Sequence, residues 1–164
     1  MGSWDDGKDQ VCAWIRERFP KTSEVLDVGA CDGRWRNLLP EYTNMDAVEV
    51  FKPYADALGG YRRVINEDIR GFCYEPYDLI IFGDVIEHMS AEDALNVLEY
   101  AKPRCRDMVV AVPFLYEQGT VDGNPFQAHV QDDLTHELFM QRFPGFEALW
   151  KSDGYCYYHK EGKE

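Results

Sequence analysis

The chain has 164 residues, 45% of them hydrophobic, and a formal net charge of −13 at pH 7. These values predict one globular domain, residues 1–164, that is large enough to bury a core. No apolar run approaches the roughly 20 residues of a membrane span and no basic, apolar leader opens the chain, so we expect a cytoplasmic protein that does not enter a membrane.

The charged residues and the cysteines restrict the partners. The chain has 17 Lys and Arg residues against 30 Asp and Glu. Binding a nucleic-acid backbone depends on Lys and Arg that displace counterions, so a nucleic-acid partner is disfavoured, with Arg62, Arg63 and Arg70 as candidates for a local basic patch. The five cysteines include no C-x-x-C pair, which predicts reduced thiols rather than disulfides or a zinc site.

The first predicted elements are a helix over 8–19 and a buried strand over 25–28. Small residues follow the strand in the sequence Asp-Val-Gly-Ala-Cys-Asp-Gly, from Asp27 to Gly33, and a helix is predicted over 35–39. Such a turn lets a ligand approach backbone N–H groups at a helix start, because glycine has no Cβ.

This turn differs from the loops that bind pyrophosphate. The dinucleotide fingerprint G-x-G-x-x-G requires a glycine where this sequence has Cys31, and no Gly-Lys-Ser/Thr of a P-loop follows. The carboxylates Asp27 and Asp32 would repel a pyrophosphate but suit a cationic or hydroxyl-rich ligand. An NAD-dependent oxidoreductase is therefore the weakest hypothesis.

Acidic residues occur at the ends of the next three predicted strands. At the end of each strand an acidic residue is followed by an apolar one: Glu49 and Val50 at the end of strand 45–50, Asp68 and Ile69 after strand 63–66, and Asp84 and Val85 after strand 79–82. Glu49 lies 22 residues after Asp27, where a carboxylate can accept hydrogen bonds from both ribose hydroxyls. Asp84 follows a central parallel strand, at the end where ligands bind in open α/β sheets.

The remaining predicted elements continue the alternation of strands and helices. They are helices over 53–58, 91–101 and 134–143, and strands over 107–112, 146–150 and 155–159. The alternation predicts an α/β fold with a Rossmann-like, doubly wound, mostly parallel seven-stranded sheet. The turn Ser152-Asp153-Gly154 predicts that the last two strands form an antiparallel hairpin.

Two of these segments resemble a known family. Residues 27–33 resemble the first motif of class I S-adenosylmethionine-dependent methyltransferases, and residues 77–89 resemble their fourth motif; the resemblance extends from Val25 to about His159. It implies S-adenosyl-L-methionine as cofactor and S-adenosyl-L-homocysteine as product. In the family, the acidic residue at the position of Asp68 faces the adenine amino group and the next apolar residue lies against the ring. The cofactor-binding residues that it implies are Asp27, Gly29, Ala30, Cys31, Gly33, Glu49, Val50, Asp68, Ile69, Asp84 and Val85.

Residues 113–134 form a connection that is long for a compact domain, and such segments are usually functional or disordered. Its aromatic and aliphatic content is too high for a disordered tail. Because it leaves the carboxyl end of the fifth strand, we expect it to fold over the cofactor and form the acceptor pocket. Its hydrogen-bonding residues suit a small-molecule or glycan-like acceptor; they are Glu117, Gln118, Asn124, Gln127 and His129.

Methyl transfer to a hydroxyl requires positioning and a base. His129, in the long loop, is the candidate general base, and Asp84 is the second candidate catalytic residue. We expect His136 to be structural and His159 to lie on the surface.

The sequence Asp84-Val-Ile-Glu87-His88 resembles the metal-binding E-x-x-E-H segment of small-RNA 2′-O-methyltransferases and of some quinone-pathway O-methyltransferases. It departs from that pattern at Asp84, which reaches less far than glutamate. A divalent ion there would lower the pKa of an acceptor hydroxyl. The alternative, which we expect, is that Glu87 and His88 pack beneath the cofactor without a metal.

The leading hypothesis is a methyltransferase that acts on an oxygen or nitrogen of a small-molecule or glycan-like acceptor, as a monomer or homodimer. One alternative is a metal-assisted RNA 2′-O-methyltransferase, against which the acidic charge and the short chain argue. A second is a catalytically inactive, cofactor-binding regulatory module.

Overall fold

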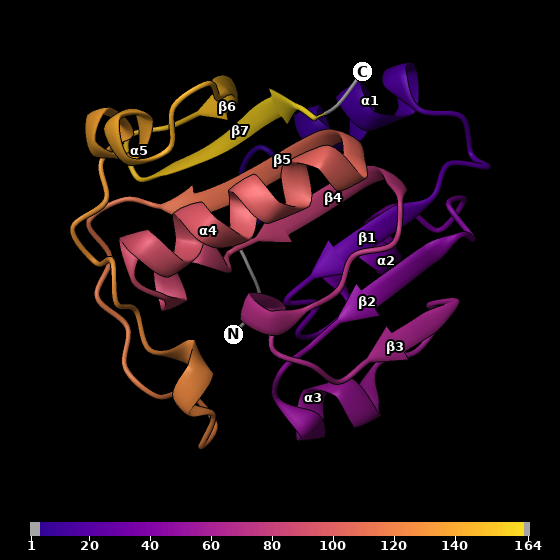
Figure 1. Ribbon diagram of the computed structural model, residues 1–164, viewed down its shortest axis with the longest axis horizontal. Helices are drawn as coiled ribbons and strands as arrows, with labels where there is room; N and C mark the ends of the chain where they lie inside the picture. Colours follow the sequence, from indigo (N-terminus) through magenta and orange to yellow (C-terminus); the bar gives the residue numbers. More distant parts are fainter. Residues whose placement is uncertain (1–3, 163–164) are drawn as a thin grey trace.

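The computed structural model describes residues 4–162, and these residues form a seven-stranded sheet in the order β3-β2-β1-β4-β5-β7-β6 (Figure 1). The parallel strands are β1 (Val25–Val28), β2 (Met45–Val48), β3 (Arg63–Ile65), β4 (Tyr77–Gly83) and β5 (Cys105–Pro113). Strand β7 (Tyr155–Glu161) pairs antiparallel with both β5 and β6 (Glu147–Lys151). The predicted Rossmann-like sheet with its antiparallel hairpin is confirmed.

Helices cover both faces of the sheet. The α-helices are α1 (Lys8–Arg18), α2 (Arg34–Leu38), α3 (Lys52–Ala57), α4 (Ala91–Ala101) and α5 (His136–Arg142), and the short 3-10 helices are η1 (Ile69–Gly71), η2 (Ile86–His88), η3 (Lys102–Arg104) and η4 (Pro125–Gln127). Side chains of α1 and α2 share one apolar cluster, and those of α4 and α5 share the other. Strand β4 contributes Leu79 and Ile81 to the first cluster, and Ile80 and Phe82 to the second. It is therefore buried on both faces, as its unbroken apolar run predicts.

Each predicted helix and strand is present, but most of the predicted bounds were wrong by one or two residues. Helix α4 begins as predicted, because the Ser90 hydroxyl accepts a hydrogen bond from the Asp93 N–H at 3.1 Å. Strand β2 ends two residues early, before Glu49, whose backbone N–H still donates to Ile65. None of the helices within residues 4–162 has the length and apolar character needed to span a membrane.

The expected surface position of His159 was wrong. Strand β7 lies between β5 and β6, and the Trp14 ring of α1 packs over the His159 ring with centroids 4.8 Å apart. His159 is 4% exposed, and its Nε2 lies 2.6 Å from Oδ1 of Asp107 on β5. Arg18 also pairs with that carboxylate at 3.0 Å, which makes this cluster a structural link between α1 and two strands.

The segment after β5 crosses the carboxyl edge of the parallel strands, drawn in orange in Figure 1. Although irregular, it is held by backbone hydrogen bonds, because the Leu115 N–H donates to Leu134 and the His129 N–H donates to Gln118. The Val130 N–H donates to the carbonyl of Glu87 at 2.8 Å, which ties the segment to η2. The edge and this segment together enclose the site.

Candidate active site

The turn after β1 requires glycine at its first position. Gly29 has φ 67°, and a Cβ there would lie 2.6 Å from Cγ2 of Val85. Its N–H donates to the Val48 carbonyl at 2.8 Å, which fixes the turn against β2. Cys31 has φ 49°, a conformation that costs energy for a residue with a Cβ. The turn thereby presents the backbone of residues 29–31 to the space above the sheet.

Glu49 ties this turn to the end of β2. Its side chain is buried, Oε2 accepts a hydrogen bond from the Cys31 N–H at 3.0 Å, and Oε1 accepts one from the Phe51 N–H at 2.8 Å. Burial raises the pKa of Glu49, and the hydrogen bonds from the backbone of Phe51, Cys31 and Val50 oppose that rise. A carboxylate has about four acceptor positions, so Glu49 can still accept a hydrogen bond from a ligand.

The strand-end cavity, as we call it, opens where β1, β2 and β4 end, and with its open mouth it measures about 650 Å³. The predicted residues that line it are Gly29, Glu49, Val50, Asp68, Ile69, Asp84 and Val85. Asp68 accepts a hydrogen bond from the Arg70 N–H at 2.9 Å and pairs with the Arg70 guanidinium at 2.6 Å, and this pairing lowers the pKa of Asp68. The cavity therefore combines apolar walls with three carboxylates, those of Glu49, Asp68 and Asp84.

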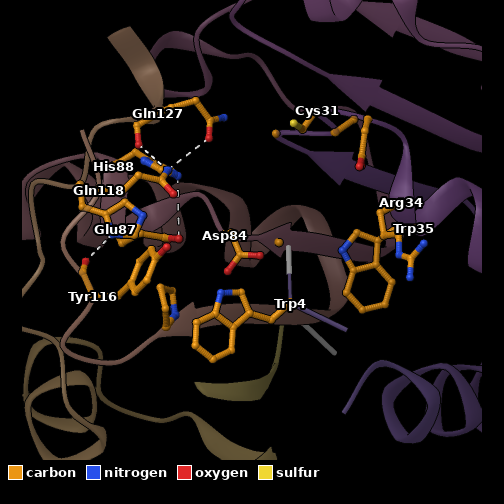
Figure 2. Close-up of a pocket in the computed structure, with 16 residues that line it drawn as sticks. Trp4, Cys31, Arg34, Trp35, Asp84, Glu87, His88, Tyr116, Gln118 and Gln127 are labelled. Carbon is orange, nitrogen blue, oxygen red and sulfur yellow. Dashed lines mark hydrogen bonds and ion pairs between the residues drawn. The ribbon is translucent and has the colours of Figure 1, made fainter. Parts of the chain in front are cut away.

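The loop-side cavity lies between the turn after β1 and the segment after β5, and measures about 670 Å³ with its open mouth. Its lining includes Trp4, Trp35, Tyr116, Gln118, Asp84, Glu87 and His129. The two cavities adjoin, because both are lined by Gly29, Asp84, His88 and Gln127. Figure 2 shows Asp84 between the side that carries Glu87 and His88 and the side that carries Trp35.

Asp84 is held in an unusual conformation at the end of β4. Its φ is 55°, and its Oδ1 accepts a hydrogen bond from the Tyr155 hydroxyl at 2.6 Å. Strand β7 therefore fixes a carboxylate that faces both cavities. Trp4 stacks on the same Tyr155, with ring centroids 5.8 Å apart, and packs edge-on against Tyr116.

Glu87, His88 and His129 form a cluster at the floor of the loop-side cavity. Glu87 is 1% exposed, and neither of its carboxylate oxygens has a hydrogen-bond partner among residues 4–162. Burial, and then the charge of Asp84, raise the pKa of Glu87 well above its ordinary value. One potential ligand atom from each of the three residues can be chosen so that all lie within 4.8 Å of one another. The sequence pattern grouped Asp84 with Glu87 and His88, whereas the structure adds His129 from the long loop.

Both histidines of the cluster are fixed through Nδ1. The His88 Nδ1 lies 3.2 Å from the Ala128 carbonyl, and the His129 Nδ1 lies 2.6 Å from the Tyr116 carbonyl, so each Nδ1–H donates. Burial, followed by the charge of His129, lowers the pKa of His88 to about 4. His88 is therefore neutral at neutral pH, with its lone pair on Nε2.

Two of the predicted cofactor-binding residues do not line either cavity. Asp27 is 1% exposed beneath the turn, where the Tyr61 hydroxyl donates to its Oδ2 at 2.6 Å, and burial raises its pKa to about 7. Gly33 begins α2, with φ 76°. Of the predicted residues, Ala30 and Cys31 line the loop-side cavity only.

The aromatic walls Trp4, Trp35 and Tyr116 were missed by the sequence analysis. Trp35 lies in α2, and its helical setting alone does not show that it faces a cavity. Trp4 precedes α1 and has no local pattern that would place it at the site. Tyr116 offered the clearest signal, because it lies in the loop that was expected to form the acceptor pocket.

The other polar candidates have structural partners. His136 stacks on Tyr158, and its Nδ1 lies 2.9 Å from the Tyr158 hydroxyl, which supports the structural interpretation. Arg62 and Arg63 both pair with the buried carboxylate of Asp46. The three arginines considered for a basic patch are thus engaged with carboxylates, since Arg70 pairs with Asp68.

The fold is that of the S-adenosylmethionine-dependent methyltransferases. One similar structure is such a methyltransferase from Clostridium acetobutylicum ATCC 824, with a TM-score of 0.72 at 12% identity over 95% of this chain and 90% of that one. The N-terminal domain of EvdMO1, with SAH bound, has a TM-score of 0.70 at 13% identity over 98% and 83%; it has also been crystallised in the presence of SAH and D-fucose.

A third similar structure is SAM-bound CalS10, an amino pentose methyltransferase from Micromonospora echinaspora. Its TM-score is 0.65 at 14% identity, over 96% of this chain and 92% of that one. No protein-family model matches the sequence, and no curated protein matches it either.

Proposed function

We propose that this protein transfers a methyl group from S-adenosylmethionine to an oxygen or nitrogen of a small-molecule or glycan-like acceptor. The observation that carries the proposal is the pair of adjoining cavities at the carboxyl edge of the sheet, which share Gly29, Asp84, His88 and Gln127. A transfer between two bound molecules needs such a junction, because the reacting atoms must come within about 3–3.5 Å of each other.

The strand-end cavity has the chemistry that an adenosine group requires. Val50 and Ile69 offer apolar walls for a planar base, and the carboxylate of Glu49 suits a ribose hydroxyl as a hydrogen-bond acceptor. The backbone of Ala30 and Cys31 continues the lining into the loop-side cavity, where the methionyl part would lie. Bound there, S-adenosylmethionine supplies an electrophilic methyl group on a sulfonium cation, and Asp84 places a carboxylate where a cation is favoured.

The loop-side cavity suits an acceptor with both apolar and hydroxyl-bearing faces. Trp4, Trp35 and Tyr116 offer aromatic surfaces, and Gln118 and Gln127 offer amides. This combination is typical of small-molecule sites, in which a few polar groups orient a ligand against apolar walls. The likeness to an amino pentose methyltransferase supports a sugar-like acceptor.

His129 is the residue that we propose as the general base. Its Nδ1–H donates to the Tyr116 carbonyl, so Nε2 carries the lone pair that can take a proton from an acceptor hydroxyl. The same hydrogen bond fixes the ring, since the carbonyl belongs to the loop that forms the cavity wall.

Calorimetry with S-adenosylhomocysteine tests the cofactor half of the proposal, and a screen of hydroxylated and amino-sugar acceptors tests the other half. We expect binding in the micromolar range and a higher melting temperature, because a ligand specific to the native state stabilises it by mass action. Binding of NAD without binding of S-adenosylhomocysteine would refute the proposal. Cofactor binding with no transfer to any acceptor would favour an inactive regulatory module.

A further inference from the structure

The floor of the loop-side cavity is made of hydrogen-bond acceptors. Glu87 is 1% exposed, and within residues 4–162 no donor forms a hydrogen bond to either of its carboxylate oxygens. Figure 2 shows its side chain directed toward Asp84, inside the cavity that it lines. Because His88 and His129 both donate from Nδ1 to backbone carbonyls, the Nε2 atoms of both rings carry lone pairs. A ligand group that fits this floor must supply several donors.

We propose that the methyl acceptor is an amine that binds as an ammonium ion, with its N–H groups donating to Glu87, His88 and His129. This inference rests on the proposed function and names its substrate class. One oxygen of Glu87 and one ring nitrogen of each histidine lie within 4.8 Å of one another. Hydrogen bonds from N–H groups measure about 2.9 Å, so two acceptors at tetrahedral positions around one nitrogen are about 4.7 Å apart. The cluster therefore has the size that one ammonium nitrogen requires.

An ammonium group suits this floor better than a hydroxyl does. A primary ammonium has three donors and no lone pair, whereas a hydroxyl has one donor and two lone pairs that would face other acceptors. A buried carboxylate also needs compensation of its charge, which a cation provides. Burial, and then the charge of Asp84, raise the pKa of Glu87 well above its ordinary value. A bound cation acts against both causes, so we expect Glu87 to hold the ammonium as a carboxylate.

A row of rings leads from this floor to the outside of the molecule. The ring centroids of His88 and His129 are 4.8 Å apart, those of His129 and Tyr116 are 5.6 Å apart, and those of Tyr116 and Trp4 are 5.8 Å apart. Tyr116 and Trp4 line the cavity, and Trp4 is 40% exposed. The faces of tyrosine and tryptophan rings attract a cation. The wall of the cavity therefore favours the same kind of ligand as its floor.

The basic side chains near the cavity are engaged elsewhere. Among the lining residues that the structure describes, Arg34 is the only lysine or arginine, and it pairs with Asp5. Lys8 does not line the cavity, and its ammonium donates to the Tyr157 hydroxyl at 3.2 Å. The compensation of the Glu87 charge is therefore left to a ligand.

His129 keeps the role of general base when the acceptor is an amine. Its Nε2 takes one proton from the bound ammonium, which leaves a lone pair on the acceptor nitrogen. After rotation about the carbon–nitrogen bond, this lone pair forms a bond to the methyl carbon as the carbon–sulfur bond breaks, and the electron pair of the broken bond remains on the thioether. His129 then releases its proton to solvent. The product is an N-methylated ammonium, which has one N–H donor fewer for the floor.

Two pairs of probes with matched carbon skeletons test the proposal on the wild-type chain: benzylamine with benzyl alcohol, and D-glucosamine with D-glucose. Each probe is titrated into the nitrogen-15-labelled protein loaded with S-adenosylhomocysteine. The indole N–H signals of Trp4 and Trp35 report binding, because both residues line the cavity, and those of Trp14 and Trp150 are the internal reference, because they line neither cavity. We expect the amine to bind at least about tenfold more tightly than its alcohol in each pair that binds. Equal affinities, or binding of neither amine up to about 50 mM, would overturn the proposal.

The variant Glu87→Gln keeps the shape of the side chain and removes its charge. We expect it to bind benzylamine at least about tenfold more weakly than wild type and benzyl alcohol within twofold. Glu92→Gln is the matched control, because Glu92 is exposed on α4 and lines neither cavity, and it should bind both probes within twofold of wild type. An unchanged preference for the amine in Glu87→Gln would overturn the site.

S-adenosylhomocysteine binding separates a failure of this proposal from a failure of the proposed function. If the wild-type chain does not bind S-adenosylhomocysteine, the proposed function itself is refuted. If it binds S-adenosylhomocysteine, and mass spectrometry shows methyl transfer to alcohols but not to amines, the proposed function stands and the ammonium site is refuted. Binding of S-adenosylhomocysteine by Glu87→Gln also shows that the variant is folded, and if it is not, the paired probes on the wild-type chain still decide.

Discussion

Replacing Glu49 by glutamine changes one atom at the point where the turn, the strand end and the proposed cofactor meet. The carboxylate accepts hydrogen bonds from the Cys31 N–H at 3.0 Å and the Phe51 N–H at 2.8 Å, one on each oxygen. Glutamine keeps one oxygen and places an NH₂ group where the other stood. The backbone N–H that bonded to the replaced oxygen then faces the side-chain NH₂ group, which is also a donor. The replaced oxygen can also no longer accept a hydrogen bond from the ribose.

Leaving a buried donor without its partner costs about 1–3 kcal/mol. The lost acceptor position leaves a ribose hydroxyl of the bound ligand without its partner, so the affinity for S-adenosylhomocysteine should decrease about 5- to 150-fold, since about 1.4 kcal/mol corresponds to a factor of ten. Because the same N–H groups are paired before the ligand binds, we also expect a lower melting temperature without ligand. Both effects follow from one geometric change.

Calorimetry of wild type and Glu49→Gln with S-adenosylhomocysteine measures the first effect, and thermal unfolding measures the second. Glu67→Gln is the matched control, because this substitution removes the same charge. Glu67 is exposed on the segment after β3 and lines neither cavity. Affinity in Glu49→Gln within twofold of wild type would refute the assignment of Glu49 to the cofactor. An equal loss of S-adenosylhomocysteine affinity in Glu67→Gln would show that the effect comes from the removed charge and not from the hydrogen bonds of Glu49.

Three further variants test other parts of the site. Burial raises the pKa of Asp27 to about 7, so stability due to its protonated form is present at low pH and is lost as the pH rises through 7. Asp27→Asn should therefore be more stable than wild type at about pH 8, by at most about 4 kcal/mol, and the difference measured by urea unfolding should shrink at about pH 5. Equal differences at both values would contradict this pKa. His129→Ala should lower kcat by about 10²–10⁴-fold with S-adenosylhomocysteine affinity unchanged, whereas a raised KM with kcat intact would leave His129 only a positioning role. Trp4→Ala should raise the acceptor KM about 2- to 10-fold at nearly constant kcat, and an unchanged KM would remove Trp4 from the acceptor wall.

The parts of the fold that depend on local pattern could be predicted from the sequence. The unbroken apolar run of β4 indicated a strand buried on both faces, and the structure confirms it. Glu49, Asp68 and Asp84 were identified because the carboxyl ends of parallel strands meet at one edge, and all three line the strand-end cavity. The bounds were less predictable, because the end of a strand is set by hydrogen bonds from its neighbours.

The direction of a side chain near a strand end could not be predicted in the same way. Asp27 belongs to the first motif, yet its carboxylate is buried beneath the turn against Tyr61, which comes from the segment before β3. His159 was misplaced for a related reason, since its burial depends on Trp14 of α1, which packs over it, and on Asp107 of β5, which it contacts. Both outcomes depend on contacts between distant segments, for which a single sequence carries no local signal.

The two cavities rest on different kinds of support. The strand-end cavity is built on β1, β2 and β4, whose parallel ladders are buried in the sheet. The loop-side cavity depends on the segment after β5 and on Trp4, which are held by a few hydrogen bonds and ring contacts. Segments with few ladder hydrogen bonds open at lower free energy and tolerate substitution, whereas strand ends in a core do not. We therefore expect changes within residues 113–134 to alter the loop-side cavity, and with it the proposed acceptor site, while leaving the strand-end cavity intact, because the loop-side cavity is the part of the site least determined by the fold.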